Sequence, residues 1–319
     1  MFNVLSLCDG MSCGQIAFRK VGINVDNYFA SEIKPHAIKL TQYNFPNTIQ
    51  IGDVNKISYK NGRLYTEHGS YPVRIDLVMF GSPCQSFSRA MIKERKIGLE
   101  DKQRSGLFLE CYRILKEVNP RYFLMENVVM NKENENVISD LLGVQPIRIN
   151  SALVSAQNRD RLYWTNIPFD IPKDKNIELK DILENGYTPL KKARCLLAND
   201  SHGFYNGSNY NQIKRFARTY LKSFGTMVAP NQDYFLNCMN VVKNELNGKK
   251  YSAKLLNNYS GSDFDCIRYL TKNERARLQT VPEKYIENLT EKEASDLLGD
   301  GWTVDVIAQI FKGLKFLVK

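Results

Sequence analysis

Cys84 is the residue of this sequence whose position most favours covalent chemistry. An apolar run from Ile75 to Phe80 predicts a buried parallel strand, and Gly81-Ser82-Pro83 ends that strand directly before the cysteine. In an open α/β sheet, ligands and reactive groups lie just beyond the carboxyl ends of the strands. A thiolate there can act as a nucleophile, especially beside positive groups or a helix N-terminus. Position alone leaves open that Cys84 is a buried structural cysteine.

Three acidic residues follow the first three predicted strands. Asp9 lies in the turn Cys8 to Gly14, Glu32 follows the second strand, and Asp53 follows the third. The turn lacks the full glycine fingerprint of a dinucleotide site, so the acids suggest a nucleoside pocket rather than a pyrophosphate cradle. Taken singly, each acid is more typical of a helix cap or a turn than of a ligand site. Their order along the chain favours the pocket.

The elements that would position these residues alternate regularly over the first 165 residues. Predicted strands cover 2–7, 25–30, 49–51, 75–80, 122–125, 146–149 and 162–166, and predicted helices cover 14–21, 35–43 and 105–118, with another ending near 142. Such alternation is typical of a doubly wound, mostly parallel α/β sheet. The carboxyl ends of its strands would bring Cys84 and the three acids to one edge.

The pattern changes after Pro168. An irregular stretch rich in Asn, Gly, Ser and Tyr predicts a second, smaller domain over residues 169–282. The chain becomes helical again after Trp302, where an apolar stripe recurs at helical spacing. We expect that helix to pack on the first domain, so the large domain would span residues 1–168 and be completed by 283–319.

Composition narrows the class of protein. The chain has 319 residues, 43% of them hydrophobic, which is ordinary for a soluble globular protein. The sequence lacks a signal peptide and a run of about 18 apolar residues, so we expect a cytoplasmic protein with no membrane partner. Seven cysteines without a C-x-x-C pair predict neither a disulfide framework nor a metal site.

The net charge of +10 is concentrated in one segment. Residues 191–254 carry eleven lysines and arginines against three acidic residues, interleaved with many aromatic and amide side chains. Such a mixture suits phosphate contacts and hydrogen bonds to base edges, with Lys214, Arg215 and Arg218 as the first candidates. The alternative is a solvated basic face that binds nothing in particular.

Ordered sequence blocks give the chain a family resemblance. They are Asp9-Gly10-Met11-Ser12-Cys13-Gly14, Glu32, Asp53, Gly81-Ser82-Pro83-Cys84-Gln85-Ser86-Phe87-Ser88, Arg104-Ser105-Gly106-Leu107-Phe108, Glu126-Asn127-Val128, Gln157-Asn158-Arg159-Asp160-Arg161 and Arg268-Tyr269-Leu270-Thr271 with Glu274, Arg277, Leu278 and Gln279. Through these blocks the chain resembles the DNA (cytosine-5) methyltransferases over nearly its whole length. Its last block, Gly299-Asp300-Gly301-Trp302-Thr303-Val304, departs from most bacterial relatives and is similar to the de novo-type branch.

The resemblance implies a fold and a cofactor. The fold would be a class I S-adenosyl-methionine-dependent methyltransferase, a Rossmann-like α/β sheet with a small inserted target-recognition domain. The cofactor would be S-adenosyl-L-methionine. The residues implied to bind it are Asp9, Gly10, Met11, Ser12, Cys13, Gly14, Glu32, Ile33, Asp53, Val54, Ser82, Pro83, Leu107, Trp302, Thr303 and Val304.

The resemblance also implies catalytic roles. Cys84 would add to C6 of cytosine, which makes C5 nucleophilic. Glu126 would hydrogen-bond N3 and the exocyclic amine, Arg159 would hold the base carbonyl, and Arg161 would support the site through Glu126 or a phosphate.

A cytosine inside a duplex cannot reach such a site while stacked, so the base must flip out of the helix. Residues 85–103 would then form a closing loop over the DNA. The DNA contacts implied there are Gln85, Ser88, Arg89, Lys102 and Arg104.

Two alternatives stay open beside an enzyme that acts on double-stranded DNA. One is a transfer-RNA cytosine-5 methyltransferase, whose usual Cys-Phe-Thr signature is missing here. The other is a DNA-binding relative without catalysis, although the Pro83-Cys84 and Glu126-Asn127-Val128 blocks are intact. A cognate restriction endonuclease is a candidate partner of the DNA enzyme.

Overall fold

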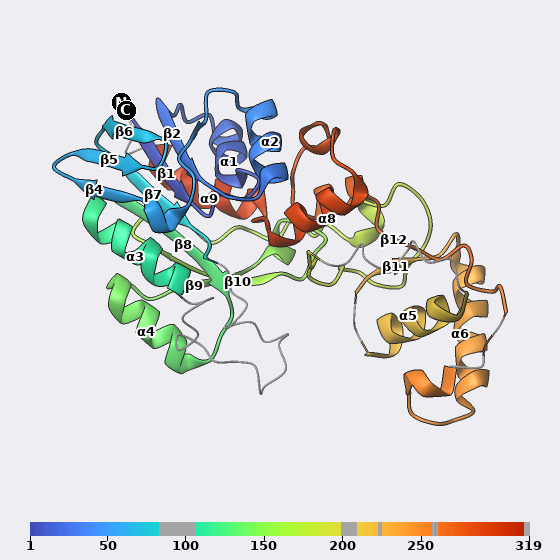
Figure 1. The fold of residues 1–319 in the computed structure, drawn as a ribbon. Coiled ribbons are helices and arrows are strands. Elements are labelled where there is room, and N and C mark those ends of the chain that lie inside the picture. Colours follow the sequence, from blue (N-terminus) through green and yellow to red (C-terminus); the bar gives the residue numbers. More distant parts are fainter. Residues whose placement is uncertain (83–105, 199–208, 223–224, 257–258, 260, 316–319) are drawn as a thin grey trace. The chain divides into compact units, whose positions relative to one another are not determined.

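The chain folds into two compact units. The computed structural model describes residues 1–82, 106–198, 209–222, 225–256, 259 and 261–315 (Figure 1). Unit 1 comprises Met1–Ser151, Asp160–Lys173 and Gly301–Lys319, and unit 2 comprises Ala152–Arg159 and Asp174–Asp300. Each unit is therefore assembled from segments that are far apart in the sequence.

Unit 1 is built on a mixed sheet. Among the described residues its strand order is β3-β2-β1-β7-β8-β10-β9. The bounds are β1 (Asn3–Leu7), β2 (Asn27–Ser31), β3 (Ile49–Gln50), β7 (Leu77–Phe80), β8 (Tyr122–Val128), β9 (Ile147–Asn150) and β10 (Asp160–Thr165). The strands from β3 to β8 are parallel, whereas β10 is antiparallel to both β8 and β9. The α/β fold class predicted from the sequence is confirmed.

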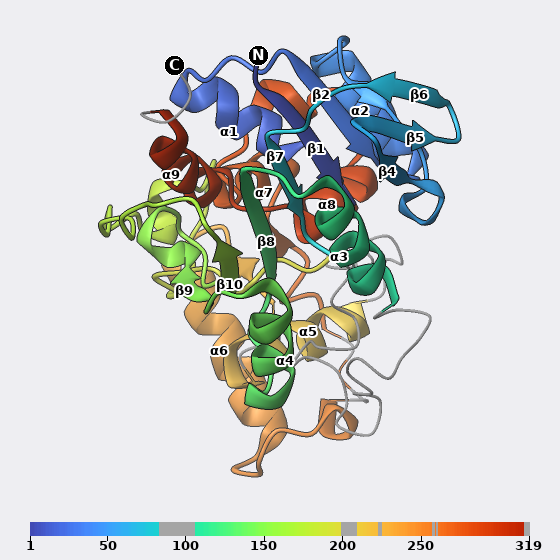
Figure 2. The same ribbon diagram turned by 90° about the vertical axis from the view of Figure 1, so that its left-hand side faces the viewer.

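Helices cover both faces of this sheet (Figure 1 and Figure 2). They are α1 (Cys13–Val21), α2 (Pro35–Asn44), α3 (Gly106–Val118), α4 (Lys132–Leu142) and α9 (Val304–Lys315). On one face, Val78 and Phe123 of the sheet share a buried core with Phe108 and Ile114 of α3. Because both faces are covered, β7 is buried along its whole length, as its continuous apolar sequence predicts.

The last helix packs on the first. The rings of Phe18 on α1 and Phe311 on α9 stack with centroids 4.1 Å apart, and Lys20 pairs with Asp305. The apolar stripe predicted after Trp302 is confirmed as α9. This packing brings the segment that begins at Gly301 into unit 1.

A small antiparallel sheet between β3 and β7 was not predicted. It contains β4 (Ser58–Lys60), β5 (Arg63–Thr66) and β6 (Gly69–Pro72). Asn61 and Gly62 join β4 to β5 with positive φ angles of 51° and 72°, the conformation of a type I′ hairpin turn. The Asn-Gly pair between alternating residues was the available sequence signal.

Unit 2 is mostly helical within its described residues. Its elements are α5 (Asn209–Lys222), β11 (Met227–Val228), α6 (Gln232–Leu246), β12 (Arg268–Tyr269), α7 (Lys272–Leu278) and α8 (Glu291–Asp300). Phe216 of α5 lies at the centre of its core, with ring centroids 5.5 Å from Phe235 and 5.3 Å from Phe264. Phe216 and Phe235 of the basic segment therefore build a core instead of offering their faces to bases.

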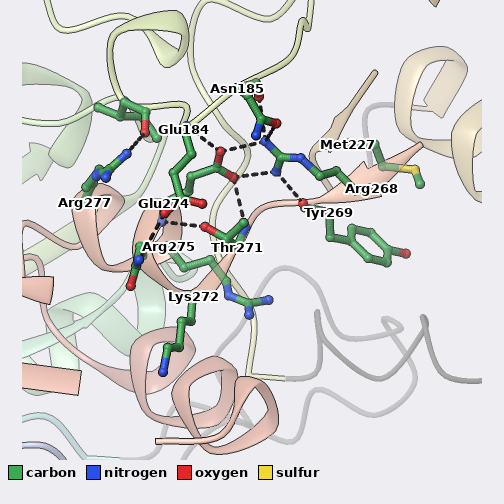
Figure 3. A network of polar contacts seen from close by, with 12 residues as sticks. Glu184, Asn185, Met227, Arg268, Tyr269, Thr271, Lys272, Glu274, Arg275 and Arg277 are labelled. Carbon is green, nitrogen blue, oxygen red and sulfur yellow. Dashed lines mark hydrogen bonds and ion pairs between the residues drawn. The ribbon is translucent and has the colours of Figure 1, made fainter. Parts of the chain in front are cut away.

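A buried carboxylate ties β12 to the start of α7 (Figure 3). Both oxygens of Glu274 accept from the Arg268 guanidinium at 2.8 Å, and they also accept from the backbone N–H groups of Glu184 and Thr271. Burial alone would raise the pKa of Glu274, but these hydrogen bonds together outweigh it and lower the pKa. The network fixes the geometry of the two elements.

The unit boundaries differ from the predicted domain limits. Residues 152–159 and 283–300 belong to unit 2, although the prediction put both in the large domain. The reason lies in long-range contacts: Gln157 accepts from the Leu196 N–H at 2.7 Å, and Glu291 of α8 pairs with Arg275 of α7.

Among the residues that the structure describes, every helix is too short or too polar to serve as a membrane span.

Candidate active site

Glu32 connects the loops that follow β1 and β2. Its Oε2 accepts from the Gly10 N–H at 2.7 Å, and its Oε1 accepts from the Ile33 and Lys34 N–H groups at 2.8 and 2.9 Å. Because a carboxylate oxygen can accept two hydrogen bonds, Oε2 retains a lone pair for a further donor. The result is a fixed acceptor at the edge of the sheet, suited to a ribose hydroxyl.

Asp9 lies beside this acceptor on the same edge. Its Oδ1 accepts from the Tyr28 hydroxyl at 2.6 Å, and its Oδ2 accepts from the Ser12 hydroxyl. Burial raises the pKa of Asp9 to about 6, although the hydrogen bonds from Ser12, Ser6 and Tyr28 act in the opposite direction. A positively charged ligand group here would favour the ionised carboxylate.

The third acid, Asp53, caps the turn after β3. Its Oδ1 accepts from the backbone and side-chain nitrogens of Asn55, and the described residues offer its Oδ2 no hydrogen bond. Ile33, next to Glu32, exposes 69% of its surface although it is apolar. An apolar side chain near carboxylate acceptors suits a nucleoside. Its base ring can pack on the apolar side chain, and its hydroxyls and amine can donate hydrogen bonds to the carboxylates.

These residues fit the group that the resemblance implies. S-adenosyl-methionine has ribose hydroxyls and an adenine amine to donate, and it carries positive charge at its sulfonium and amino groups. Acidic residues at three neighbouring strand ends, Asp9, Glu32 and Asp53, offer acceptors and negative charge, and Ile33 offers an apolar surface. These acceptors, their negative charge and the apolar surface are thus compatible with this cofactor.

The rest of the first loop faces inward. The side chains of Met11, Ser12 and Cys13 are buried, as is Val54 of the third loop. A Cβ on Gly14 would lie 2.2 Å from Cε of Met79, so the glycine allows α1 to approach β7 closely. Only backbone groups of this stretch could therefore contact a ligand without repacking.

A second cluster surrounds Glu126 on β8. Arg161 of β10 places its Nε 2.9 Å from Glu126 Oε1, and Trp302 donates its indole N–H to Oε2 at 3.1 Å. Glu126 is 8% exposed. Both carboxylate oxygens are therefore held by N–H groups, so the orientation of the side chain is fixed.

Gly81 makes room for this cluster at the end of β7. A Cβ there would lie 2.7 Å from Nε1 of Trp302 and 3.2 Å from Oε2 of Glu126. Ser82 follows, buried and within 3.5 Å of the Asn127 amide nitrogen. Gly81 and Ser82, which lie beside the Glu126 cluster, are followed in the sequence by Pro83 and Cys84. Both of these residues lie outside the described residues.

Three other residues predicted to bind the cofactor have structural contacts. Thr303 is buried and accepts from the Ser151 hydroxyl at 2.8 Å, and Val304 is buried at the start of α9. Leu107, near the start of α3, packs against the main core of the sheet. None of these contacts tests a cofactor role, so that role stays a prediction.

Arg159 lies in unit 2 and is 3% exposed. Its Nη1 donates to the Leu196 carbonyl at 3.3 Å and to Cys195 Sγ at 3.4 Å, and its Nη2 donates to the Gly299 carbonyl at 3.2 Å. These contacts fix the guanidinium within unit 2. Its role at the base carbonyl stays a prediction.

The predicted DNA contacts fall into two groups. Gln85, Ser88, Arg89, Lys102 and Arg104 lie outside the described residues. Lys214, Arg215 and Arg218 lie on α5, where Arg218 is exposed and the other two are half-buried. Their contact with DNA stays a prediction.

Sequence reasoning missed two contributions to these clusters. Tyr28 was counted only as part of an apolar strand, yet its hydroxyl holds Asp9. Trp302 was assigned to the cofactor alone, yet its N–H holds Glu126 from a position 176 residues away. No local pattern carries either signal, because both contacts join strand or loop residues distant in sequence.

Related proteins with known folds have the same overall architecture. The Dnmt2 methyltransferase of S. pombe is 17% identical, with a TM-score of 0.63 and complete coverage of both chains. The Entamoeba histolytica methyltransferase EhMeth is 18% identical, with a TM-score of 0.66 over all of this chain and 99% of that one. At such identities the likeness concerns the fold.

Sequence relatives point to the family. The orphan methyltransferase M.SPRI of Bacillus phage SPR is 32% identical over 58% of this chain and 43% of its own length, so this chain spans less than half of that relative. The type II methyltransferase M1.ScrFI of Lactococcus lactis subsp. cremoris is 27% identical over 97% of this chain and 77% of its own length. The model of the C-5 cytosine-specific DNA methylases matches residues 2–315. The chain therefore belongs to the C-5 cytosine-specific DNA methylase family.

Proposed function

We propose that this protein is a DNA (cytosine-5) methyltransferase that acts on a cytosine flipped out of double-stranded DNA. The observation that carries the proposal is the Glu126 cluster. A carboxylate held by Arg161 and Trp302 lies beside the strand end that leads to Pro83-Cys84. Family membership supports the same reaction.

The cofactor end of the site is assigned to the acids at the strand ends. When bound, S-adenosyl-methionine supplies an electrophilic methyl group. Glu32 would accept from the ribose hydroxyls, Asp53 from the adenine amine, and Ile33 would contact the adenine face. Asp9 would compensate positive charge, since its carboxylate is already oriented by Tyr28 and Ser12.

Cys84 would provide covalent catalysis. Its thiolate would add to C6 of cytosine, which places the electron pair of the C5–C6 bond at C5 and makes that carbon nucleophilic towards the methyl group that the cofactor would supply. A base then removes the C5 proton, the double bond re-forms, and the thiolate leaves. The addition requires that charge developing at N3 be stabilised.

Glu126 is the residue proposed to meet that charge. From its position on β8 its carboxyl group, in the protonated form, would donate a hydrogen bond to N3 and accept one from the exocyclic amine, and Arg161 and Trp302 would keep that group in place. Such pre-organisation means that little reorientation is needed when the base arrives. Arg159 would hold the carbonyl oxygen of the base.

The DNA substrate is favoured over RNA by two comparisons. The family model is that of DNA methylases, and the relatives named above are phage orphan and type II methyltransferases. The missing Cys-Phe-Thr signature argues in the same direction. A restriction endonuclease partner belongs to this proposal as well.

Nucleoside mass spectrometry tests the proposal. Purified protein and S-adenosyl-methionine are incubated with duplex DNA or, separately, with transfer RNA, and 5-methylcytosine is expected in the DNA alone. Cys84→Ala should lose turnover but keep cofactor and DNA binding, because only the covalent step is removed. Methylation of RNA alone would refute the DNA assignment, and turnover by Cys84→Ala above a few per cent of wild type would refute the role of Cys84.

A further inference from the structure

Unit 2 contains a small cleft that no part of the proposed reaction uses. Its lining includes Arg194, Thr226 and Tyr269, together with Arg275 of α7, and all of its residues lie within the described part of unit 2. Figure 3 shows Tyr269 and Arg275 on the neighbouring elements β12 and α7. The lining residues include two arginines and no acidic residue. The cleft is therefore positively charged.

The two arginines differ in how their charge is balanced. Arg275 is buried and pairs with Glu291. Arg194 is half-buried, and within the described residues its guanidinium has no hydrogen-bond acceptor, although its backbone N–H donates to the Thr226 hydroxyl oxygen at 3.0 Å. Its Nε is excluded from solvent, but the side chain as a whole is only half-buried. Because a guanidinium in such a position normally has a partner, an acceptor that enters the cleft would bind to it there.

We propose that this cleft binds a phosphate group of the DNA backbone. Arginine presents several N–H donors in a planar fork that matches phosphate oxygens, and the Thr226 hydroxyl can donate as well. Arg194 also lies in the basic segment 191–254, where eleven lysines and arginines face three acids, so a polyanion is favoured over an isolated small anion. The assignment of that phosphate to DNA rests on the proposed function.

The salt dependence of DNA binding tests the cleft. Duplex binding is measured by fluorescence anisotropy at several salt concentrations for wild type, Arg194→Gln and Arg194→Lys. Because Arg194 would neutralise one phosphate, Arg194→Gln should reduce the slope of log affinity against log salt by about 0.9. Arg194→Lys keeps the positive charge and should recover most of the slope, which a folding defect would not allow.

Arg277→Gln is the matched control. It removes an arginine of the same unit whose donors are already engaged by Glu283 and the Ile182 carbonyl, so its slope should equal that of wild type. An unchanged slope in Arg194→Gln, or an equal decrease in Arg277→Gln, would overturn the proposal.

A second measurement separates this inference from the proposed function. At constant ionic strength, inorganic phosphate should raise the Tm of wild type relative to chloride, and Arg194→Gln should lose this increase. If wild type binds no duplex but still shows the Arg194-dependent increase, the phosphate site stands and the DNA function fails. If phosphate stabilises both proteins equally, the cleft is not the phosphate site.

Discussion

At the scale of single residues, the site depends on carboxylates that are already oriented. Glu126 is held through both oxygens, and Glu32 accepts three backbone N–H groups. A carboxylate with fixed geometry loses little rotamer freedom when a ligand binds. Under the proposed function, hydrogen bonds to these carboxylates would therefore serve binding and catalysis, even where their donors never touch substrate.

Trp302 provides a direct test of this view. Trp302→Phe keeps an aromatic ring but removes the N–H that donates to Glu126. A hydrogen bond to a charged group contributes about 1.5–3 kcal/mol, so we expect kcat to fall about 10- to 100-fold. Single-turnover methyl transfer at saturating cofactor measures this effect. If the KM for cofactor rises while kcat stays constant, Trp302 acts on the cofactor and not through Glu126.

Asp9 predicts a pH dependence of stability. Because its folded pKa of about 6 lies above the ordinary value, the group favours the folded state below that ordinary value and loses this contribution as pH rises through about 6. Wild type should therefore lose stability relative to Asp9→Asn between about pH 4 and pH 7.

Thermal melts over that range, with Asp140→Asn on the exposed side of α4 as the charge control, measure the difference. Melting curves of wild type and Asp9→Asn that shift in parallel with pH would contradict the assigned pKa. Asp140→Asn itself should follow wild type across the range, since it leaves Asp9 in place.

At the scale of elements, a helix cap and an ion pair fix how α7 and β12 are joined. Thr271 begins α7 with a reciprocal capping box, in which its hydroxyl accepts from the Glu274 N–H and Glu274 accepts in return. The same carboxylate pairs with Arg268 of β12. One buried side chain thus joins a helix start to a strand.

Glu274→Gln should destabilise this junction. It leaves the partly exposed Arg268 without its ion-pair partner, and we expect a cost of about 2–4 kcal/mol in the free energy of unfolding at neutral pH. Because the pKa of Glu274 is lowered on folding, this stabilisation is present above the ordinary glutamate pKa and is lost as pH falls through the folded value.

Urea denaturation of wild type and Glu274→Gln at pH 7 and in acid measures both effects, and the difference between the two proteins should shrink in acid. Glu283→Gln breaks the more exposed pair with Arg277 and should cost less than about 1 kcal/mol. Equal costs for the two variants would show that burial does not determine the strength of the Glu274 contacts.

At the scale of the whole molecule, positive charge is concentrated in the part of the sequence that builds much of unit 2. Among the described aromatic residues of that segment, Phe216 and Phe235 are buried in the core. Contact with a polyanion would therefore be made by the lysines and arginines around that core. Binding of DNA should accordingly be strongly salt-dependent.

We expect that replacing Lys214, Arg215 and Arg218 together by Gln weakens duplex binding. The slope of log affinity against log salt should fall by up to about 0.9 for each phosphate that these side chains neutralise in wild type. Anisotropy titrations over a salt series measure the slope. A second triple variant, Lys243, Lys249 and Lys250 to Gln, changes the net charge equally. If both triples have the same effect, net charge and not the position on α5 controls binding.

The sequence by itself indicated many elements of unit 1 and the family to which the chain belongs. The apolar runs that become β1 and β7, the stripe of α9, and the ordered blocks around Cys84 and Glu126 were all readable, because strand burial, helix periodicity and family motifs are local properties of the chain. The hairpin at Asn61-Gly62 was readable too, although it was not predicted.

Only the tertiary structure decided which partners those residues meet. Trp302 holds Glu126, Tyr28 holds Asp9, and Arg159 is enclosed by carbonyl groups of unit 2. The boundaries of the units also followed from long-range contacts, such as that of Gln157 with Leu196. The physical reason is that periodicity reports whether a side chain is buried, whereas the identity of its neighbours depends on how distant segments pack.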